Sequence, residues 1–317
     1  MRTIGEYFSK NYWKYGFSYT KVIKDLLSVL GVLWLLVEIT SYFSEHLAKS
    51  IKEYWYIFFA IGALITIWKN RPILSVKYKL NGRDIIIEVR ISDIFSIDGA
   101  QIIGANTTFD TDLASGLISE KSLQGQLTKR YYGNVNHLDG DLDEALKFET
   151  YNELEDGSKI GKLREYEIGT VANITVRNRN VYFVAVAKLN AHGRSYSSFD
   201  NIKECLVKIW DYIANRGAME SLVIPVLGTG LARVEVEREV MIKEIIMSFI
   251  AACSTKRFTE KLTIVIHPSD YKKFDINIFE IGEFLSYQCK YVQFKNTSDV
   301  GEGTAIPTED ARGHVFG

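Results

Sequence analysis

The chain has 317 residues, 47% of them hydrophobic and 24% charged, a composition that excludes a disordered or collagen-like protein. The formal net charge of −1 gives no overall basic field, which argues against a dedicated nucleic-acid binder. Cys205, Cys253 and Cys289 are far apart and odd in number, so we expect buried, reduced thiols rather than a disulfide framework or a zinc site.

Two apolar runs near the N-terminus predict a hairpin of transmembrane helices, at about residues 26–43 and 51–68. A spanning helix needs roughly 20 mostly apolar residues, and the second run approaches this length if its flanking lysines snorkel to the headgroups. The first run starts too far from Met1 and is too long for a signal peptide. Two amphipathic core helices are the alternative, although residues 26–37 show no polar stripe.

The charges that flank these runs predict their orientation. Lysines precede the first run and follow the second, while residues 44–53 carry two lysines balanced by two glutamates. Because positive residues stay on the inner side of a membrane, we expect both termini in the cytoplasm. Glu38 falls within the first run, where it lies either near the outer interface or inside an oligomeric pore.

Beyond Pro72, strands alternate with helices, and this pattern predicts a three-layer α/β/α domain over residues 72–295. We interpret residues 131–167, which are polar and acidic with little periodicity, as an insertion, and residues 296–317 as a flexible tail. Strands are expected at residues 73–78, 84–89, 100–104, 170–176, 181–188, 222–226 and 262–266, and helices at 119–130, 199–216, 235–252 and 276–287.

Three loops after predicted strands have the composition of a nucleotide site. Small residues and Asn106 end the first, at residues 102–108. The second, at residues 114–119, leads into a predicted helix, where free backbone N–H groups could meet phosphate. In the third, at residues 224–231, glycines would let backbone amides approach an anion closely. Each loop alone is weak evidence, whereas their order along the chain is more specific.

In this order the loops resemble those of the macro-domain family, over about residues 73–287. Ser92-Asp93-Ile94 resembles the family's Gly-Asp-Ile, whose acidic residue holds the adenine amino group, and Asn106 matches the last Asn of Asn-Ala-Ala-Asn, near the distal ribose. Residues 224–230 are similar to Pro-Ala-Leu-Gly-Thr-Gly, the loop that wraps the diphosphate. The resemblance implies a macro domain with a mixed central sheet and an ADP-ribose-type ligand.

The resemblance also implies which residues touch that ligand. His192 and Arg194 are further candidates for its terminal group, unless they belong to an ordinary solvated loop. No cofactor, metal ligand or catalytic residue is expected. The implied ligand-binding residues are Asp93, Ile94, Ala105, Asn106, Thr107, Ser115, Gly116, Leu117, Ile118, Val226, Leu227, Gly228, Thr229, Gly230, Leu231 and Arg233.

Departures from the family pattern favour binding over catalysis. The glycine run of the first phosphate loop is reduced to Gly116, and the Asp that follows it in hydrolytic macro domains is absent. Glu120 is expected inside a helix and pointing elsewhere, and Arg233 replaces a common glycine, so the distal end is shaped for something other than plain ADP-ribose. The alternatives are a membrane-tethered ADP-ribosyl hydrolase and an anchor for ADP-ribosylated partners.

Two N-terminal spans joined to such a domain are similar to the membrane-spanning macro-domain effectors of bacterial Thoeris anti-phage systems. This resemblance implies a partner TIR-domain enzyme that consumes NAD and makes an ADP-ribose-derived signal, reported as histidine-ADP-ribose. The effector binds the signal, assembles as a homo-oligomer, a tetramer or larger, and permeabilises the bacterial inner membrane. Residues 131–167 and 190–198 are candidate moving parts, or plain surface loops. No nucleic-acid partner is expected.

Overall fold

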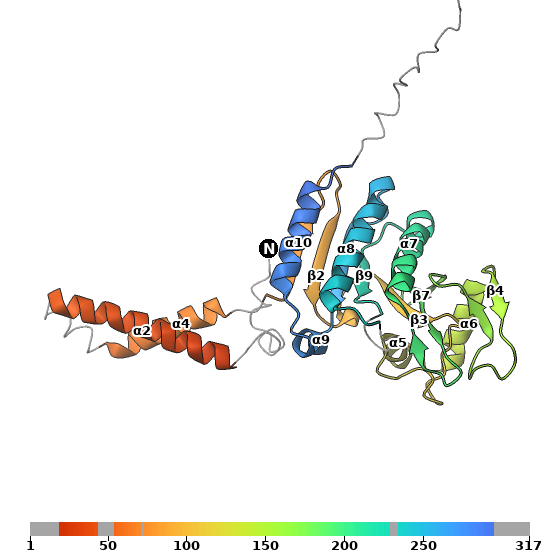
Figure 1. Ribbon diagram of the computed structural model, residues 1–317, viewed down its shortest axis with the longest axis horizontal. Coiled ribbons are helices and arrows are strands. Elements are labelled where there is room, and N and C mark those ends of the chain that lie inside the picture. Colours follow the sequence, from red (N-terminus) through yellow and green to blue (C-terminus); the bar gives the residue numbers. More distant parts are fainter. Residues whose placement is uncertain (1–18, 44–53, 71–72, 229–233, 295–317) are drawn as a thin grey trace, which may run out of the picture.

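The computed structural model describes residues 19–43, 54–70, 73–228 and 234–294 (Figure 1). A mixed eight-stranded sheet has the order β1-β2-β10-β9-β3-β7-β6, with β8 paired to β7. Neighbours from β2 to β7 run parallel, and β1, β6 and β8 pair antiparallel. The mixed sheet is therefore confirmed. The strands are β1 (Ser75–Lys79), β2 (Ile86–Ile91), β3 (Ala100–Asn106), β6 (Val171–Val176), β7 (Arg179–Leu189), β8 (Ser195–Tyr196), β9 (Leu222–Pro225) and β10 (Lys261–Ile266).

Alternate residues of the central strands enter two separate cores, one on each face of the sheet. On β7, Tyr182 and Val184 join one core, and Val181 and Phe183 join the other. Helices cover both faces, which confirms the three-layer arrangement (Figure 1). One layer holds α7 (Phe199–Arg216), α8 (Arg238–Thr255) and α10 (Ile278–Tyr291), and the other holds α5 (Leu123–Tyr131) and α6 (Val135–Leu146).

Capping side chains decide where the helices begin. Helix α7 has its predicted bounds, and the Ser198 hydroxyl accepts a hydrogen bond from the Asn201 N–H at 3.1 Å. Helix α5 begins at Leu123 rather than at residue 119, because Ser122 is its N-cap and accepts from the Gly125 N–H at 3.0 Å. The expected placement of Glu120 inside this helix is wrong, since the residue lies in the turn before it.

The insertion at residues 131–167 is more regular than expected. It contains α6 and a small sheet of β4 (Tyr151–Glu153) and β5 (Arg164–Tyr166). Leu138, Leu142 and Leu146 are buried in the core that α6 shares with the sheet. Their spacing of four residues places them on one helical face, a signal that the polar composition concealed.

Helices α2 (Tyr19–Phe43) and α4 (Trp55–Lys69) lie side by side, beyond the layered domain (Figure 1). Asp25 joins their ends, because its carboxylate accepts from Lys69 Nζ at 2.8 Å and from Asn70 Nδ2 at 2.9 Å. Gly62 permits close packing, since a Cβ there would lie 2.7 Å from Leu30 Cδ2. The predicted spans fall largely on this pair, with residues 51–53 outside the described residues. Within the described ranges, every helix is too short or too polar to cross a membrane.

Candidate functional site

A cavity of about 740 Å³ lies where the parallel strands reach their carboxyl ends. Five adjacent strands each contribute a residue to its wall at or just after their carboxyl ends. In the order of the sheet these are Ser92 after β2, His267 after β10, Val226 after β9, Asn106 at the end of β3 and Leu189 at the end of β7. Adjacent strands lie about 4.8 Å apart, so these five positions extend over roughly 19 Å. Such carboxyl-end crevices are where open α/β sheets bind ligands, and this one suits an elongated molecule.

Asn106 holds a fixed amide orientation at the cavity wall. Its side-chain oxygen accepts from the backbone N–H groups of Thr108 and Asp110, each at 3.1 Å. Backbone N–H groups only donate, so these contacts assign the oxygen and the nitrogen of the amide. The nitrogen is buried and has no hydrogen-bond partner. An unpaired buried donor costs about 1–3 kcal/mol, which a ligand oxygen would recover.

Behind Asn106, Asp110 and Lys159 form a buried ion pair. Asp110 Oδ2 lies 3.1 Å from Lys159 Nζ, and the two side chains are 2% and 4% exposed. Asp110 Oδ1 also accepts from the Lys162 backbone N–H at 2.6 Å, and the Thr108 hydroxyl donates to Oδ2. Sequence reasoning missed this pair, because Lys159 lies in the insertion and carries no local signal for its partner.

The first predicted phosphate loop is closed on itself. The backbone N–H groups of residues 114–118 all donate within the loop: two to the Asp112 carboxylate, one to the Asp112 carbonyl, one to Ser115 Oγ and one to the Leu113 carbonyl. Hydrogen bonds from Ser115, first from its hydroxyl and then from its backbone N–H, hold the pKa of the Asp112 carboxyl below its ordinary value. These five N–H groups are therefore engaged within the loop, whereas the free N–H groups for phosphate were expected at the start of the helix that follows it.

The third loop needs glycine at position 228. Gly228 has a φ of +71°, and a Cβ there would lie 2.9 Å from Ile202 Cδ1 and 3.0 Å from Val234 Cγ2. The loop backbone therefore lies against α7 with no space for a side chain. The remaining predicted residues of this loop lie outside the described residues: Thr229, Gly230, Leu231 and Arg233.

Asp93 stands beside the cavity wall rather than on it. Its Oδ1 accepts from the Phe95 backbone N–H at 3.1 Å, and its Oδ2 lies 3.1 Å from the Arg130 guanidinium. The same guanidinium lies 4.3 Å from the centre of the Phe95 ring. Asp93 and Arg130 are both partly exposed, so neither group is sealed from an entering ligand.

The predicted site residues divide into those that line the cavity and those that do not. Eight line it: Ile94, Ala105, Asn106, Leu117, Ile118, Val226, Leu227 and Gly228. Thr107 turns its hydroxyl toward Glu165 at 3.2 Å. Asp93, Thr107, Ser115, Gly116, His192 and Arg194 are off the wall, and the last two are exposed on the turn after β7.

Leu117 connects the wall to both candidate moving segments. A Cβ at Gly161 would lie 2.6 Å from Leu117 Cδ2, and one at Gly193 would lie 2.8 Å from Leu117 Cδ1. Gly161 belongs to the insertion and Gly193 to the turn after β7. Both segments therefore pack on one side chain of the cavity wall.

Several wall residues escaped the sequence analysis. They include Lys121, Ser122, Gln126, and the polar group His267, Ser269 and Asp270. Glu120 also lines the cavity, so the expectation that it points elsewhere is wrong. His267 Nδ1 lies 2.7 Å from Ser269 Oγ. The position of these polar residues in the sequence could have indicated them. They come directly after the last predicted strand, so they lie at the same edge of the sheet as the three loops.

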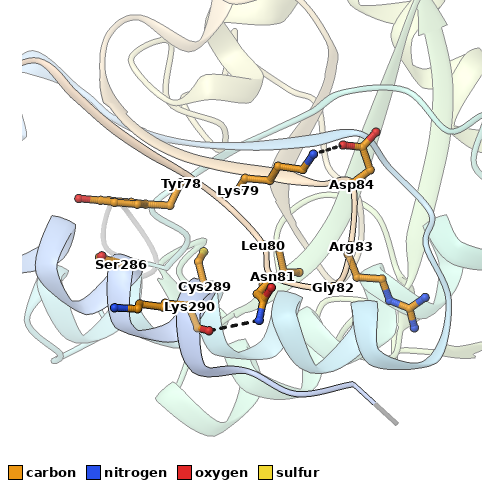
Figure 2. Close-up of a pocket in the computed structure, with 10 residues that line it drawn as sticks. All are labelled: Tyr78, Lys79, Leu80, Asn81, Gly82, Arg83, Asp84, Ser286, Cys289 and Lys290. Atoms are coloured by element: carbon orange, nitrogen blue, oxygen red, sulfur yellow. Dashed lines mark hydrogen bonds and ion pairs between the residues drawn. The ribbon is translucent and has the colours of Figure 1, made fainter. Parts of the chain in front are cut away.

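A second hollow lies near the amino end of β2, beside the end of α10 (Figure 2). Two of its polar contacts lie within the hollow itself: Lys79 Nζ lies 2.7 Å from Asp84 Oδ1, and Asn81 Nδ2 lies 3.4 Å from the Lys290 carbonyl oxygen. It is a broad, open depression. The cavity at the carboxyl ends, with the unpaired nitrogen of Asn106, is the better candidate for a ligand site.

Comparison with known proteins bears on the same region. A family described as the macro domain of the Thoeris protein ThsA matches residues 87–267. The chain is 28% identical over 218 residues to the Thoeris protein ThsA of Bacillus amyloliquefaciens (strain Y2), covering 66% of this chain and 70% of that protein.

Solved macrodomains are also similar, at lower identity. One is the Oceanobacillus iheyensis macrodomain with ADP, with 13% identity and a TM-score of 0.44, covering 68% of this chain and 95% of that one. Another is the Trypanosoma brucei macrodomain in complex with ADP-ribose, with 10% identity and a TM-score of 0.40, covering 61% and 70%. Family membership rests on the sequence match rather than on these two structures.

Proposed function

The chain belongs to the family of Thoeris ThsA macro domains, and from this we propose that it is an anti-phage effector whose cavity binds an ADP-ribose-derived signal. The observation that carries the proposal is the Asn106 amide nitrogen, buried without a partner at the cavity wall. A sugar hydroxyl or phosphate oxygen would satisfy this donor.

The dimensions of the cavity support an elongated nucleotide. Its wall extends over roughly 19 Å of sheet edge, from the β2 end to the β7 end. A base near Ser92 and Ile94 would place the diphosphate by Val226 and Gly228, at the middle strand β9. The second ribose would then reach Asn106. This order agrees with the roles that the family resemblance implies for Asp93 and Asn106.

We propose binding without catalysis. Asp110 is the carboxylate closest in sequence to Asn106, and it is buried and engaged by Lys159, Thr108 and the Lys162 N–H. Glu120 lines the cavity, and its carboxylate lies 2.6 Å from Lys129 Nζ. A carboxylate enclosed as that of Asp110 is poorly placed to activate water, which supports an effector rather than a hydrolase.

The membrane role is proposed for the helix pair α2 and α4. Large apolar side chains on both helices are exposed, among them Trp34 at 69%, Leu64 at 66% and Trp68 at 68%. Exposed apolar surface of this kind marks contact with lipid or with other subunits. We propose that the pair lies in the bacterial inner membrane, and that signal binding drives assembly of several chains and permeabilises the membrane.

The identity of the signal is proposed from the family resemblance. A partner TIR-domain enzyme would consume NAD and supply an ADP-ribose derivative, of which histidine-ADP-ribose is the first candidate. Titrating ADP-ribose and its histidine adduct in parallel tests this, because the true signal should bind more tightly. Equal affinity for the two would remove the histidine group from the proposal.

One set of experiments separates effector from enzyme and anchor. The full chain, purified in detergent, is incubated with histidine-ADP-ribose and measured by mass photometry, and separately with ADP-ribosylated protein to detect free ADP-ribose. We expect an increase in assembly mass and no release. Release of ADP-ribose at many turnovers would establish a hydrolase, and binding without a change in mass would establish an anchor.

Alkaline extraction of cell membranes tests the location, since a peripheral protein would be released.

A further inference from the structure

The ion pair of Asp110 and Lys159 is buried, although both residues lie in loops. Both side chains are almost fully enclosed, and their charged atoms lie 3.1 Å apart. Taking two charges out of water is costly, and the pair offsets this only with good geometry and further hydrogen bonds. Asp110 has these, from the Lys162 N–H at 2.6 Å and from the Thr108 hydroxyl.

The pair is directly connected to the amide of Asn106. The Asp110 backbone N–H and the Thr108 hydroxyl both lie 3.1 Å from Asn106 Oδ1, and this hydroxyl also contacts the Asp110 carboxylate. A displacement of Asp110 would therefore disturb two of the three contacts that fix the amide, and would leave the one from the Thr108 backbone N–H. With a single contact left, the Asn106 amide could rotate or turn its oxygen toward the wall.

Lys159 is supplied by the insertion, which is itself fastened to the same loop. Lys162 Nζ lies 2.6 Å from Asp139 Oδ1 on α6, and this carboxylate oxygen also accepts from the Thr111 hydroxyl at 2.7 Å. The segment 159–162 therefore bridges the loop after β3 and helix α6. The insertion contributes to the site at the end of the groove where β3 and β7 finish.

We propose that Lys159 and Asp110 are positioning residues that hold the Asn106 amide for a group beyond the diphosphate, and so set selectivity for ADP-ribose over ADP. The inference rests on the proposed function, because it takes the ligand to be a nucleotide whose second ribose reaches Asn106. ADP ends at its diphosphate and would leave this end of the groove empty. Loss of the ion pair should then weaken ADP-ribose and spare ADP.

The test compares two ligands on the full chain in detergent. Lys159→Met removes the cation, and Asp110→Asn with Lys159→Met removes both charges, so that no unpaired charge remains buried. Lys79→Met is the matched control, since it breaks an exposed pair 2.7 Å long in the other hollow (Figure 2). Dissociation constants for ADP-ribose and ADP are measured by calorimetry, and folding is checked by thermal melting.

We expect the preference for ADP-ribose over ADP to fall by about tenfold or more in the double variant, with ADP affinity and the control unchanged. A purely structural role would weaken both ligands together and lower the melting temperature, and that result would overturn the inference. An unchanged preference in a folded double variant would overturn it too. If the unmodified chain binds neither ligand, the proposed function fails first, and the inference fails with it.

Discussion

The backbone N–H of Asp110 donates to the side-chain oxygen of Asn106 at 3.1 Å, and this contact leaves the amide nitrogen of Asn106 unpaired at the wall of the cavity. A protein rarely keeps a buried donor unsatisfied, because the free-energy cost is about 1–3 kcal/mol. The relationship between these two residues therefore keeps a buried donor available at the cavity wall, where a ligand oxygen would complete its hydrogen bonding.

Asn106→Asp should abolish tight nucleotide binding. The substitution keeps the size of the side chain but removes the N–H donor, and it adds a negative charge that repels the anionic diphosphate. We expect the ADP-ribose affinity to fall by at least about tenfold in calorimetry. Asn152→Asp, on exposed β4, is the control and should bind normally. Normal affinity in the Asn106→Asp variant would mean that this amide does not meet the ligand.

Gly228→Ala should destabilise the domain more than Gly116→Ala. Both glycines have positive φ angles, +71° and +78°, so both substitutions carry backbone strain of about 1 kcal/mol. At Gly228 the new Cβ also meets Ile202 and Val234 within 3.0 Å, whereas at Gly116 nothing lies within 4 Å. Overpacking adds about 1–3 kcal/mol. Thermal melting of the two full-length variants measures the difference in stability. Equal melting temperatures would show that α7 moves enough to make room for the new Cβ.

Asp93→Ala should weaken nucleotide binding while Arg130→Met should not. The first removes the carboxylate expected to meet the base, and the second removes only its partner at 3.1 Å. Exposed ion pairs contribute about 0–1 kcal/mol, so both proteins should remain folded. Calorimetry with ADP-ribose distinguishes the two. If Arg130→Met alone weakens binding, the guanidinium rather than the carboxylate recognises the ligand.

The cysteines should be unreactive in the folded chain. Burial raises the pKa of Cys289 to about 11 and that of Cys253 to about 12. The thiolate is the reactive form, so alkylation at pH 8 should be slow until denaturant unfolds the chain. Mass spectrometry after iodoacetamide treatment measures this. Rapid labelling of Cys289 at pH 8 in the folded protein would contradict the burial.

The same pKa shifts predict a pH dependence of stability. A thiol whose pKa is raised by folding favours the folded state fully below the unfolded pKa, near 9.0, and this contribution is lost as the pH rises through the folded pKa. The melting temperature should therefore begin to fall above pH 9 and continue to fall toward pH 11. Cys289→Ser should reduce the part of this fall between pH 9 and 11. An equal fall in that variant would place its origin in other groups.

The sequence predicted the layered domain because its signals were local. The buried residues Ile202, Leu206, Ile209 and Ile213 of α7 repeat at helical spacing, and the strands of the sheet are short apolar runs. Helix α6 was missed because its three buried leucines are separated by acidic and polar residues. The structure puts eight of the predicted site residues on one wall, because strand ends that follow from the pattern converge at one edge of the sheet.

What sequence could not supply was contact between distant segments. Lys159 pairs with Asp110, 49 positions away, and Leu117 packs against Gly161 and Gly193. No sequence pattern predicts either contact. The closure of the loop at residues 114–118 on Asp112 was also hidden, because a short polar loop can donate inward or outward with the same composition. The sequence therefore predicts which residues follow the strand ends and line the cavity better than it predicts the contacts that hold those residues in place.

Calorimetric titration of ADP-ribose into the full chain in detergent, beside the Asn106→Asp variant and with thermal melting of both, is the most direct test of the proposed ADP-ribose site. We predict saturable binding at one site per chain in the unmodified protein and its loss in the variant, at nearly equal melting temperatures. Absence of binding to an unmodified protein that melts cooperatively would contradict the assignment of this cavity as an ADP-ribose site.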